Sequence, residues 1–183
     1  GPVRTLDDIK GLDLRASGGA AQILGAWGAN PVGMPMPATV EALQKGVVKG
    51  LYSSLEVMKD FKFAESCKYV TKTDTVIYPF AVVMNMDKWN SLPKDVQKVF
   101  SDLRVEQTEW TGNYMDNHVK AAMEWSVKSQ KVEVIELSAA EKAKWDARLE
   151  PLTAKWIEKA KAKGLPAEAI VADIKALVKK HSK

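Results

Sequence analysis

The strongest constraint on the fold of this 183-residue chain is one long helical pattern in its second half. It follows Ser91-Leu92-Pro93, and from Lys94 to Gln130 apolar side chains recur every three or four residues over most of the length. Such a helix would be roughly 55 Å long at about 1.5 Å per residue, which exceeds the diameter of a small domain. The segment therefore has to bridge two bodies or project from one, and we expect a bend at Gly112 in its middle.

The composition is that of a globular protein with a real core, because 46% of the residues are hydrophobic and 27% are charged. No apolar run reaches the roughly 18 residues that a membrane span requires. A single cysteine, Cys67, excludes an intrachain disulfide, and with only two histidines we expect no structural zinc site. The glycines do not form a phosphate loop or a dinucleotide fingerprint, so no cofactor is expected.

The excess of positive charge is confined to the end of the chain. Residues 141–183 hold 11 Lys and Arg against 6 Asp and Glu, whereas the net charge of the whole chain is +4. The lysines alternate with Trp145, Leu149, Trp156 and Ile157 at helical spacing, which is typical of a packing helix rather than of a nucleic-acid-binding surface. No candidate nucleophile has an acid–base partner near it in the sequence, so the residues alone do not favour an enzymatic function.

Residues 10–55 predict a strand, helix, strand, helix, strand order, preceded by a helix start with Thr5 as N-cap and Asp8 at the third helical position. The alternation of apolar and polar residues predicts a strand at 12–16, and short strands are expected at 32–34 and after Gly50. Helices are expected at 20–29 and from Pro37 to Gly50. This order is typical of an α/β unit with parallel strands.

Outside this unit and the long helix, the chain adds two predicted strands and two predicted helices. Residues 75–84 are the most apolar stretch and predict a buried strand, with a bend or an edge position at Pro79. A short strand is expected at 132–137. Ser138 and Glu141 form a capping box for a helix that Pro151 should kink or split. Gly164 ends that helix, and Pro166 starts the last one.

Arg15 is the candidate functional residue that the pattern itself singles out. It lies at the end of a predicted inner strand, between apolar residues. Ligands of open α/β sheets bind beyond the carboxyl ends of the strands, and a guanidinium group there can hold a carboxylate with two parallel hydrogen bonds. The alternative is an arginine that simply ends the strand in solvent.

Four segments resemble the solute-binding proteins of tripartite ATP-independent periplasmic (TRAP) transporters, the DctP-like family. Residues 7–15, DDIKGLDLR, resemble the family segment DLKGLKIR, and residues 28–35, GANPVGMP, resemble GANPVPMP. Residues 40–50, VEALQKGVVKG, resemble VYTALQQGVVDG, and residues 83–93, VMNMDKWNSLP, resemble VINKKFWDSLP. The four segments come in the family's order, and the similarity covers most of the chain.

The resemblance implies an α/β, periplasmic-binding-protein-like fold of two lobes that close around a ligand. It places residues 1–55 in the second lobe, 56–93 in a crossover toward the first lobe, 94–130 in a lobe-spanning helix and 131–183 in a short strand and C-terminal helices. Most of the first lobe then lies outside this chain, which corresponds to slightly over half of a longer protein. Without the first lobe, apolar side chains that it would cover are exposed, and this surface should favour self-association of the chain.

The resemblance also implies a set of ligand-binding residues. Arg15 matches the arginine that pairs with the ligand carboxylate, and Met36 matches a position that is often a phenylalanine packed on the ligand. Tyr52 and Ser53 fall where the family often has Glu followed by Asn or Trp. Tyr78 is a further candidate for the wall of the site, although it can equally be a core residue. No second arginine occupies a matching position, and Arg4 in the entry turn is expected to be solvated. Lys49, which stands where the family often has an Asp, is the alternative second cation.

The function implied is that of an extracytoplasmic, periplasmic receptor that captures an organic carboxylate and delivers it to the membrane subunits of a TRAP transporter. One arginine beside hydroxyl and aromatic groups favours a monocarboxylate over a di- or tricarboxylate. Neither a metal nor nucleic acid is expected as a partner. The alternative is a ligand-sensing regulatory module with the same fold, which the N-terminal sequence of the longer protein would distinguish.

Overall fold

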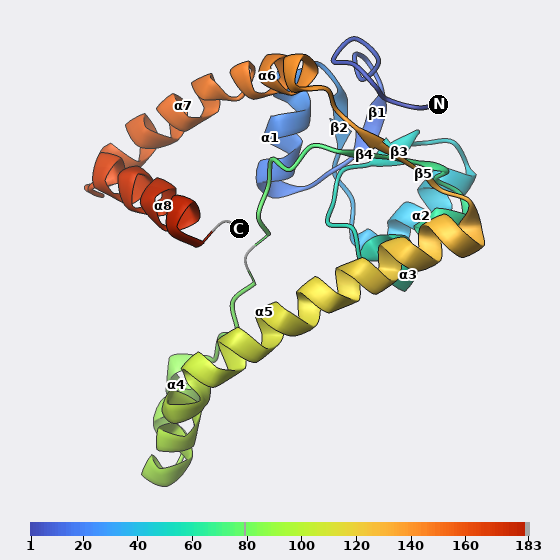
Figure 1. Ribbon diagram of the computed structural model, residues 1–183. Coiled ribbons are helices and arrows are strands. Elements are labelled where there is room, and N and C mark those ends of the chain that lie inside the picture. The colour runs from blue at the N-terminus through green and yellow to red at the C-terminus, as the bar shows by residue number, and fades with distance from the viewer. Residues whose placement is uncertain (79, 182–183) are drawn as a thin grey trace.

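Three short parallel strands near the start of the chain form the central sheet of the computed structural model, which describes residues 1–78 and 80–181 (Figure 1). Their order across the sheet is β2-β1-β3. The strands and the helices between them are β1 (Asp13–Arg15), α1 (Gly18–Trp27), β2 (Asn30–Val32), α2 (Met36–Gln44) and β3 (Gly50–Leu51). The predicted parallel α/β unit is therefore confirmed.

The strand order places α1 and α2 on opposite faces of this sheet. The chain moves from β1 to β2 in one direction and then returns past β1 to β3, and right-handed crossovers in opposite directions leave their helices on opposite faces. The hydrophobic clusters agree, because α1 belongs to one cluster and α2 packs against the other. The strand order thus reverses between β1 and β3, which is where ligands bind in open α/β sheets.

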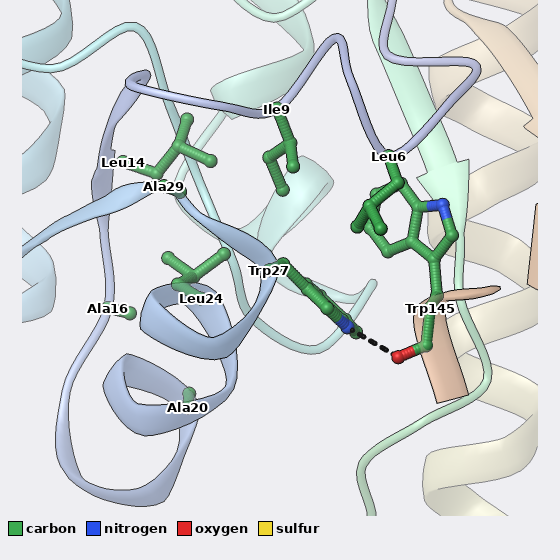
Figure 2. Close-up of a cluster of buried hydrophobic side chains, with 9 residues drawn as sticks. All are labelled: Leu6, Ile9, Leu14, Ala16, Ala20, Leu24, Trp27, Ala29 and Trp145. Carbon is green, nitrogen blue, oxygen red and sulfur yellow. Dashed lines mark hydrogen bonds between the residues drawn. The ribbon is translucent and has the colours of Figure 1, made fainter. Parts of the chain in front are cut away.

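The first hydrophobic cluster joins α1 to a helix far along the chain. Trp27 of α1 and Trp145 of α6 (Ala139–Ala147) are 2% and 1% exposed, and their rings meet edge to face with centroids 4.6 Å apart. The indole Nε1 of Trp27 donates a hydrogen bond of 3.1 Å to the carbonyl oxygen of Trp145 (Figure 2). Trp145 therefore anchors α6 to the body.

The second hydrophobic cluster lies on the other face of the sheet, where Val40 and Leu43 of α2 pack against it. It includes Phe63, which is 2% exposed, and residues of α3 (Val57–Asp60) and the 3₁₀ turn η1 (Phe63–Glu65). Strand β4 (Tyr69–Lys72) contributes Val70 and pairs in parallel with β5 (Glu133–Glu136) to form a second, two-stranded sheet. β5 confirms the strand expected at 132–137, whereas β4 was not predicted.

The long helix α5 spans Lys94–Gln130, the same residues that the sequence predicts. It packs against the body only near its C-terminal end, where Ala122 and Ser126 are buried and His118 Nε2 lies 2.9 Å from both carboxylate oxygens of Asp60. Helical structure continues through Gly112 without a break. The short helix α4 (Met86–Ser91), which was not predicted, sits at the free end of α5 (Figure 1).

Of the last three helices, α6 lies against the body, and the two that follow it extend away as an arm (Figure 1). The capping box of α6 is confirmed on its Ser138 side, because the Ser138 hydroxyl accepts a hydrogen bond of 3.2 Å from the Glu141 amide. Pro151 lies in the first turn of α7 (Glu150–Lys161), so the expected split from α6 is confirmed. The final helix, α8 (Ala167–His181), follows Pro166 as predicted and packs on α7.

Two local predictions were wrong. The stretch 75–78 and 80–84 forms no strand, and Ile77 and Phe80 are 78% and 87% exposed. A strand needs a neighbour to receive its backbone hydrogen bonds, and in the described residues no strand runs beside this stretch. The bend or edge position expected at Pro79 lies outside the described residues.

The expected helix start at Thr5 is a series of turns. The Asp8 carboxylate accepts hydrogen bonds of 2.8 and 2.9 Å from the backbone amides of Thr5 and Arg4, as a capping residue would, but Gly11 follows with φ at 69°. This conformation ends the turn before a helix can form.

None of the helices in the described part of the chain has the length and apolar character needed to cross a lipid bilayer.

Candidate functional site

Arg15 ends the central strand β1 at the point where the strand order reverses. Its register partner is Leu51 of β3, and its carbonyl oxygen accepts a hydrogen bond of 2.9 Å from the Tyr52 amide, just beyond β3. The side chain is only 7% exposed. The parallel pairing of β1 and β3 thus places Tyr52 beside the carboxyl end of β1, and Ser53 follows in the loop.

The Arg15 guanidinium group is fixed by a backbone carbonyl and not by a carboxylate. Nε and Nη2 donate hydrogen bonds of 3.0 and 2.8 Å to the carbonyl oxygen of Met34. An arginine has five N–H donors, so about three remain, including both on Nη1. In the part of the chain that the structure describes, Arg15 forms no ion pair. A buried positive charge with free donors suits an incoming anion.

Two tyrosines line the environment of Arg15. The ring of Tyr52 packs edge to face on Trp27 with centroids 5.3 Å apart, and its hydroxyl lies 3.3 Å from the hydroxyl of Thr73. The Tyr78 hydroxyl is buried and has no hydrogen-bond partner among the described residues. Burial, with a smaller effect from neighbouring Tyr52, raises the pKa of Tyr78 to about 12, while Arg15 acts in the opposite direction. Tyr78 therefore stays a neutral hydrogen-bond donor.

Met36 and Ser53 have different positions relative to Arg15. Met36 is the first residue of α2, and its side chain packs against the second hydrophobic cluster, two residues beyond the carbonyl that holds Arg15. Ser53 is half-buried in the loop that follows β3. Arg15, Tyr52 and Tyr78 therefore share one environment, and Ser53 borders it in sequence. The role of Met36 as a ligand contact stays a prediction.

The other cations considered in the sequence lie elsewhere. The Lys49 amide donates to the carbonyl of Asp13, which places Lys49 at the opposite end of the strands from Arg15. Its ammonium group donates to the Gly46 carbonyl at 3.2 Å. Arg4 pairs with Glu133 at 2.5 Å. Of Arg4, Arg15 and Lys49, Arg15 is therefore the one that lies at the carboxyl end of the central strands.

Sequence reasoning missed two partners within this region. The Met34 carbonyl that holds Arg15 is a backbone group, and no side-chain pattern signals it. Glu56 is half-buried just before α3, and its carboxylate accepts a hydrogen bond of 2.5 Å from the Ser54 hydroxyl. The sequence could have indicated Glu56, because its carboxylate follows the expected ligand contact Ser53 by only three residues.

Two hollows lie away from Arg15. One, of about 360 Å³, is bordered by the N-terminal turns and α6, with Asp7, Lys10, Glu141 and Lys144 in its walls. The other, of about 310 Å³, lies between α2 and the α3–η1 region. In the described residues, no three His, Cys, Asp or Glu side chains gather as a metal site requires. Burial also raises the pKa of the Cys67 thiol, which makes it a poor nucleophile.

Comparison with known proteins gives a consistent result. The family model described as "DctP: Bacterial extracellular solute-binding protein, family 7" matches residues 1–160. The C4-dicarboxylate-binding protein DctB of Bacillus subtilis is 29% identical over 154 residues, covering 83% of this chain and 44% of that protein. The C4-dicarboxylate-binding periplasmic protein DctP of Rhodobacter capsulatus is 28% identical over 155 residues, covering 82% and 46%. The chain thus spans less than half the length of these curated relatives.

Solved structures extend the match to the whole chain. A TRAP periplasmic solute-binding protein from Desulfovibrio salexigens is 53% identical with a TM-score of 0.86, covering 100% of this chain and 57% of that one. It was solved as an open complex with the C-terminus of a symmetry mate in its ligand-binding site. A marine metagenome TRAP protein specific for aromatic acid ligands, in complex with 3-hydroxybenzoate, is 29% identical with a TM-score of 0.86, covering 100% and 59%.

Proposed function

Because the chain belongs to the bacterial extracellular solute-binding proteins of family 7, we propose that the full-length protein is the solute receptor of a TRAP transporter. It binds an organic carboxylate through Arg15 and delivers it to the membrane subunits. The observation that carries this proposal is the buried Arg15 guanidinium, which ends β1 at the reversal of strand order with free donors and no carboxylate partner in the described residues. The function is binding and not catalysis, and its place is outside the cytoplasm, in the periplasm.

The proposal includes the division of the chain. Residues 1–55 belong to a second lobe, 56–93 cross toward a first lobe, 94–130 connect the lobes and 131–183 supply a short strand and the C-terminal helices. Two observations support this division. The chain covers 57% of its Desulfovibrio relative, and many of the exposed large apolar residues lie on the crossover and on the free part of α5. Contacts from both lobes would favour the closed state once a ligand is bound.

We infer that the ligand is a monocarboxylate with an apolar or aromatic body. The relatives are divided: two are C4-dicarboxylate-binding proteins, and one is specific for aromatic acids. The Desulfovibrio relative holds a chain terminus in its site, and a chain terminus presents one carboxylate of its own. In this chain the backbone of Tyr52 bonds to the end of β1, Ser53 follows it, and Lys49 lies at the other end of the sheet. A second carboxylate would need a second cation.

A thermal-shift panel on the full-length protein tests the proposal. Ligand binding raises the melting temperature according to the ligand concentration relative to Kd. Benzoate, mandelate and 3-hydroxybenzoate should stabilise the wild-type protein but not Arg15→Ala. Strong stabilisation by succinate or malate, with none by monocarboxylates of similar size, would contradict the preference. Equal stabilisation of Arg15→Ala would contradict the site.

A further inference from the structure

The helix α8 carries an apolar stripe of which only the first part is covered. Ala167 begins the stripe and is 0% exposed, at the end of α8 that follows the turn from α7. The stripe continues at helical spacing, but Ile174, Leu177 and Val178 are 55%, 55% and 44% exposed. The outer half of the apolar face of α8 therefore has no partner among the described residues.

The helix α7 adds a tryptophan to this surface near the turn of the arm. Trp156 is 43% exposed and lies one helical turn before Ala160, which is 5% exposed. The Ala160 carbonyl accepts a hydrogen bond of 3.1 Å from the Leu165 amide, and Lys161 pairs with Glu168, so the turn between the two helices is closed. The arm surface consists of Trp156, Ile174, Leu177 and Val178.

The arm needs packing that the described residues do not supply. A helix of 15 residues, the length of α8, is marginal in water by itself. Most helical stability in proteins comes from burial of an apolar face, and here α7 covers only the first part of that face. The rest of the stripe should therefore lie against another part of the full-length protein.

The match to the Desulfovibrio relative indicates which part this is. The match includes 100% of this chain, arm included, with a TM-score of 0.86, and covers 57% of that protein, which leaves about two fifths of it outside. The arm thus takes a similar course in a longer protein. The family model ends at residue 160, so α8 lies outside the region that the model matches.

The arrangement of the elements places the missing part within reach of the arm. In Figure 1 the arm and the free part of α5 leave the body toward the same side, and the chain before α4 runs between them. That stretch and the free part of α5 both expose large apolar side chains. A first lobe that covers these residues would lie beside the arm.

We propose that the arm surface docks on the first lobe of the full-length protein. The proposal rests on the two-lobe division under the proposed function. The matching surface of the first lobe is apolar, because the arm surface contains no charged residue, and Lys179 and Lys180 lie in the last turn of α8. Since Trp145 anchors α6 to the second lobe, the arm links the lobes independently of α5.

Hydrogen–deuterium exchange of the full-length protein tests the docking. Ile174→Ser combined with Leu177→Ser should make exchange about tenfold faster or more in the segments of the first lobe that the arm covers, because each aliphatic side chain loses its burial. The matched control is Ala172→Ser combined with Ala176→Ser, since both alanines are exposed on the opposite face of α8. The control lowers helix propensity at least as much, yet exchange in the first lobe should stay unchanged.

Leu177→Ala is a milder variant in case the double variant does not fold, and it should affect the same segments. Wild-type exchange of the first lobe in both arm variants would overturn the docking. Protection of α8 in the wild type only at concentrations where sedimentation velocity shows dimers would also overturn it, because a second copy then covers the surface.

A benzoate titration of the same samples separates the docking from the receptor function. If benzoate binds and the first lobe does not respond to the arm variants, the docking is overturned and the receptor function stands. If the first lobe responds and no carboxylate of the thermal-shift panel binds, the receptor function is overturned and the docking stands.

Discussion

Arg15 carries a full charge although only 7% of its surface is exposed, and the carbonyl of Met34 offsets only part of the cost. A carbonyl oxygen supplies a partial negative charge, whereas a carboxylate supplies a full one and can accept two parallel hydrogen bonds. The residue was predictable because a strand end next to apolar neighbours is visible in the sequence. The carbonyl that orients it was not, because its position depends on the loop before α2.

The first prediction concerns Arg15→Lys in the full-length protein. Lysine keeps the charge but loses the planar pair of donors, so carboxylate binding should weaken by about 2 kcal/mol or more, as measured by calorimetry. Arg4→Lys is the control, because Arg4 forms an exposed ion pair with Glu133 away from the site. Unchanged Kd values in both Arg15→Lys and Arg15→Ala would remove Arg15 from the site.

The second prediction concerns the Tyr78 hydroxyl and alkaline pH. The pKa of Tyr78 in the folded protein is about 12, above the value of about 10 for an unfolded tyrosine. The neutral phenol therefore contributes its full stability below about pH 10, and this contribution is lost as the pH rises toward about 12. Urea titrations should show a steeper fall in unfolding free energy over this range in wild type than in Tyr78→Phe.

The matched control for that experiment is Tyr114→Phe, because Tyr114 is 51% exposed on α5. It should follow the wild-type curve. An identical pH dependence in wild type and Tyr78→Phe would mean that the phenol is not buried.

At the scale of elements, the sequence predicted those whose stability is local. The helix α5 and the Ser138 cap of α6 depend on neighbouring residues, and both are confirmed. Strand β4 was missed, while the more apolar stretch from residue 75 to 84 was wrongly predicted to be a strand. β4 exists because β5, more than 60 residues later, pairs with it. Pairing between distant segments is not encoded in the apolarity of either one.

The third prediction uses two glycines that differ in backbone conformation. Gly112 lies in the interior of α5, and a Cβ atom there would meet no atom within 4 Å. Gly112→Ala should therefore stabilise the protein by up to about 1 kcal/mol, since alanine favours the helix. Gly28→Ala should destabilise it, because Gly28 has φ at 92° and a Cβ atom would lie 3.3 Å from Lys10 Cγ. Thermal unfolding of both variants checks the opposite signs, and destabilisation by Gly112→Ala would contradict the reasoning.

At the scale of the whole molecule, the hydrophobic residues are unevenly covered. The sheet with α1, α2 and α3 encloses two buried clusters, whereas large apolar side chains remain exposed on the stretch before α4 and along the free part of α5. The sequence predicted this division through the family resemblance, since the helical periodicity of α5 by itself did not indicate which face would be covered. Contiguous exposed patches of this kind mark surfaces that bind another protein surface.

The fourth prediction is that residues 1–183 alone self-associate through this surface. Sedimentation velocity should show dimers or larger species whose proportion rises with concentration. Replacing Phe80, Val82 and Val83 with serine should reduce the association, because all three are at least 84% exposed and contribute to the surface. Val57→Ser serves as the contrast, because Val57 is buried and its replacement is expected to unfold the body. A strictly monomeric chain would contradict this prediction.

The attachment of α5 at one end gives the helix the mechanical properties of a lever. His118, Ala122 and Ser126 fix its C-terminal part to α3 and η1, while the part from Lys94 to Tyr114 is free of the body. This free part is roughly 30 Å long at about 1.5 Å per residue, so a rotation of about 10° at the fixed end moves the tip by about 5 Å. Small rearrangements around Asp60 are therefore amplified at α4, where a spectroscopic label would report them most sensitively.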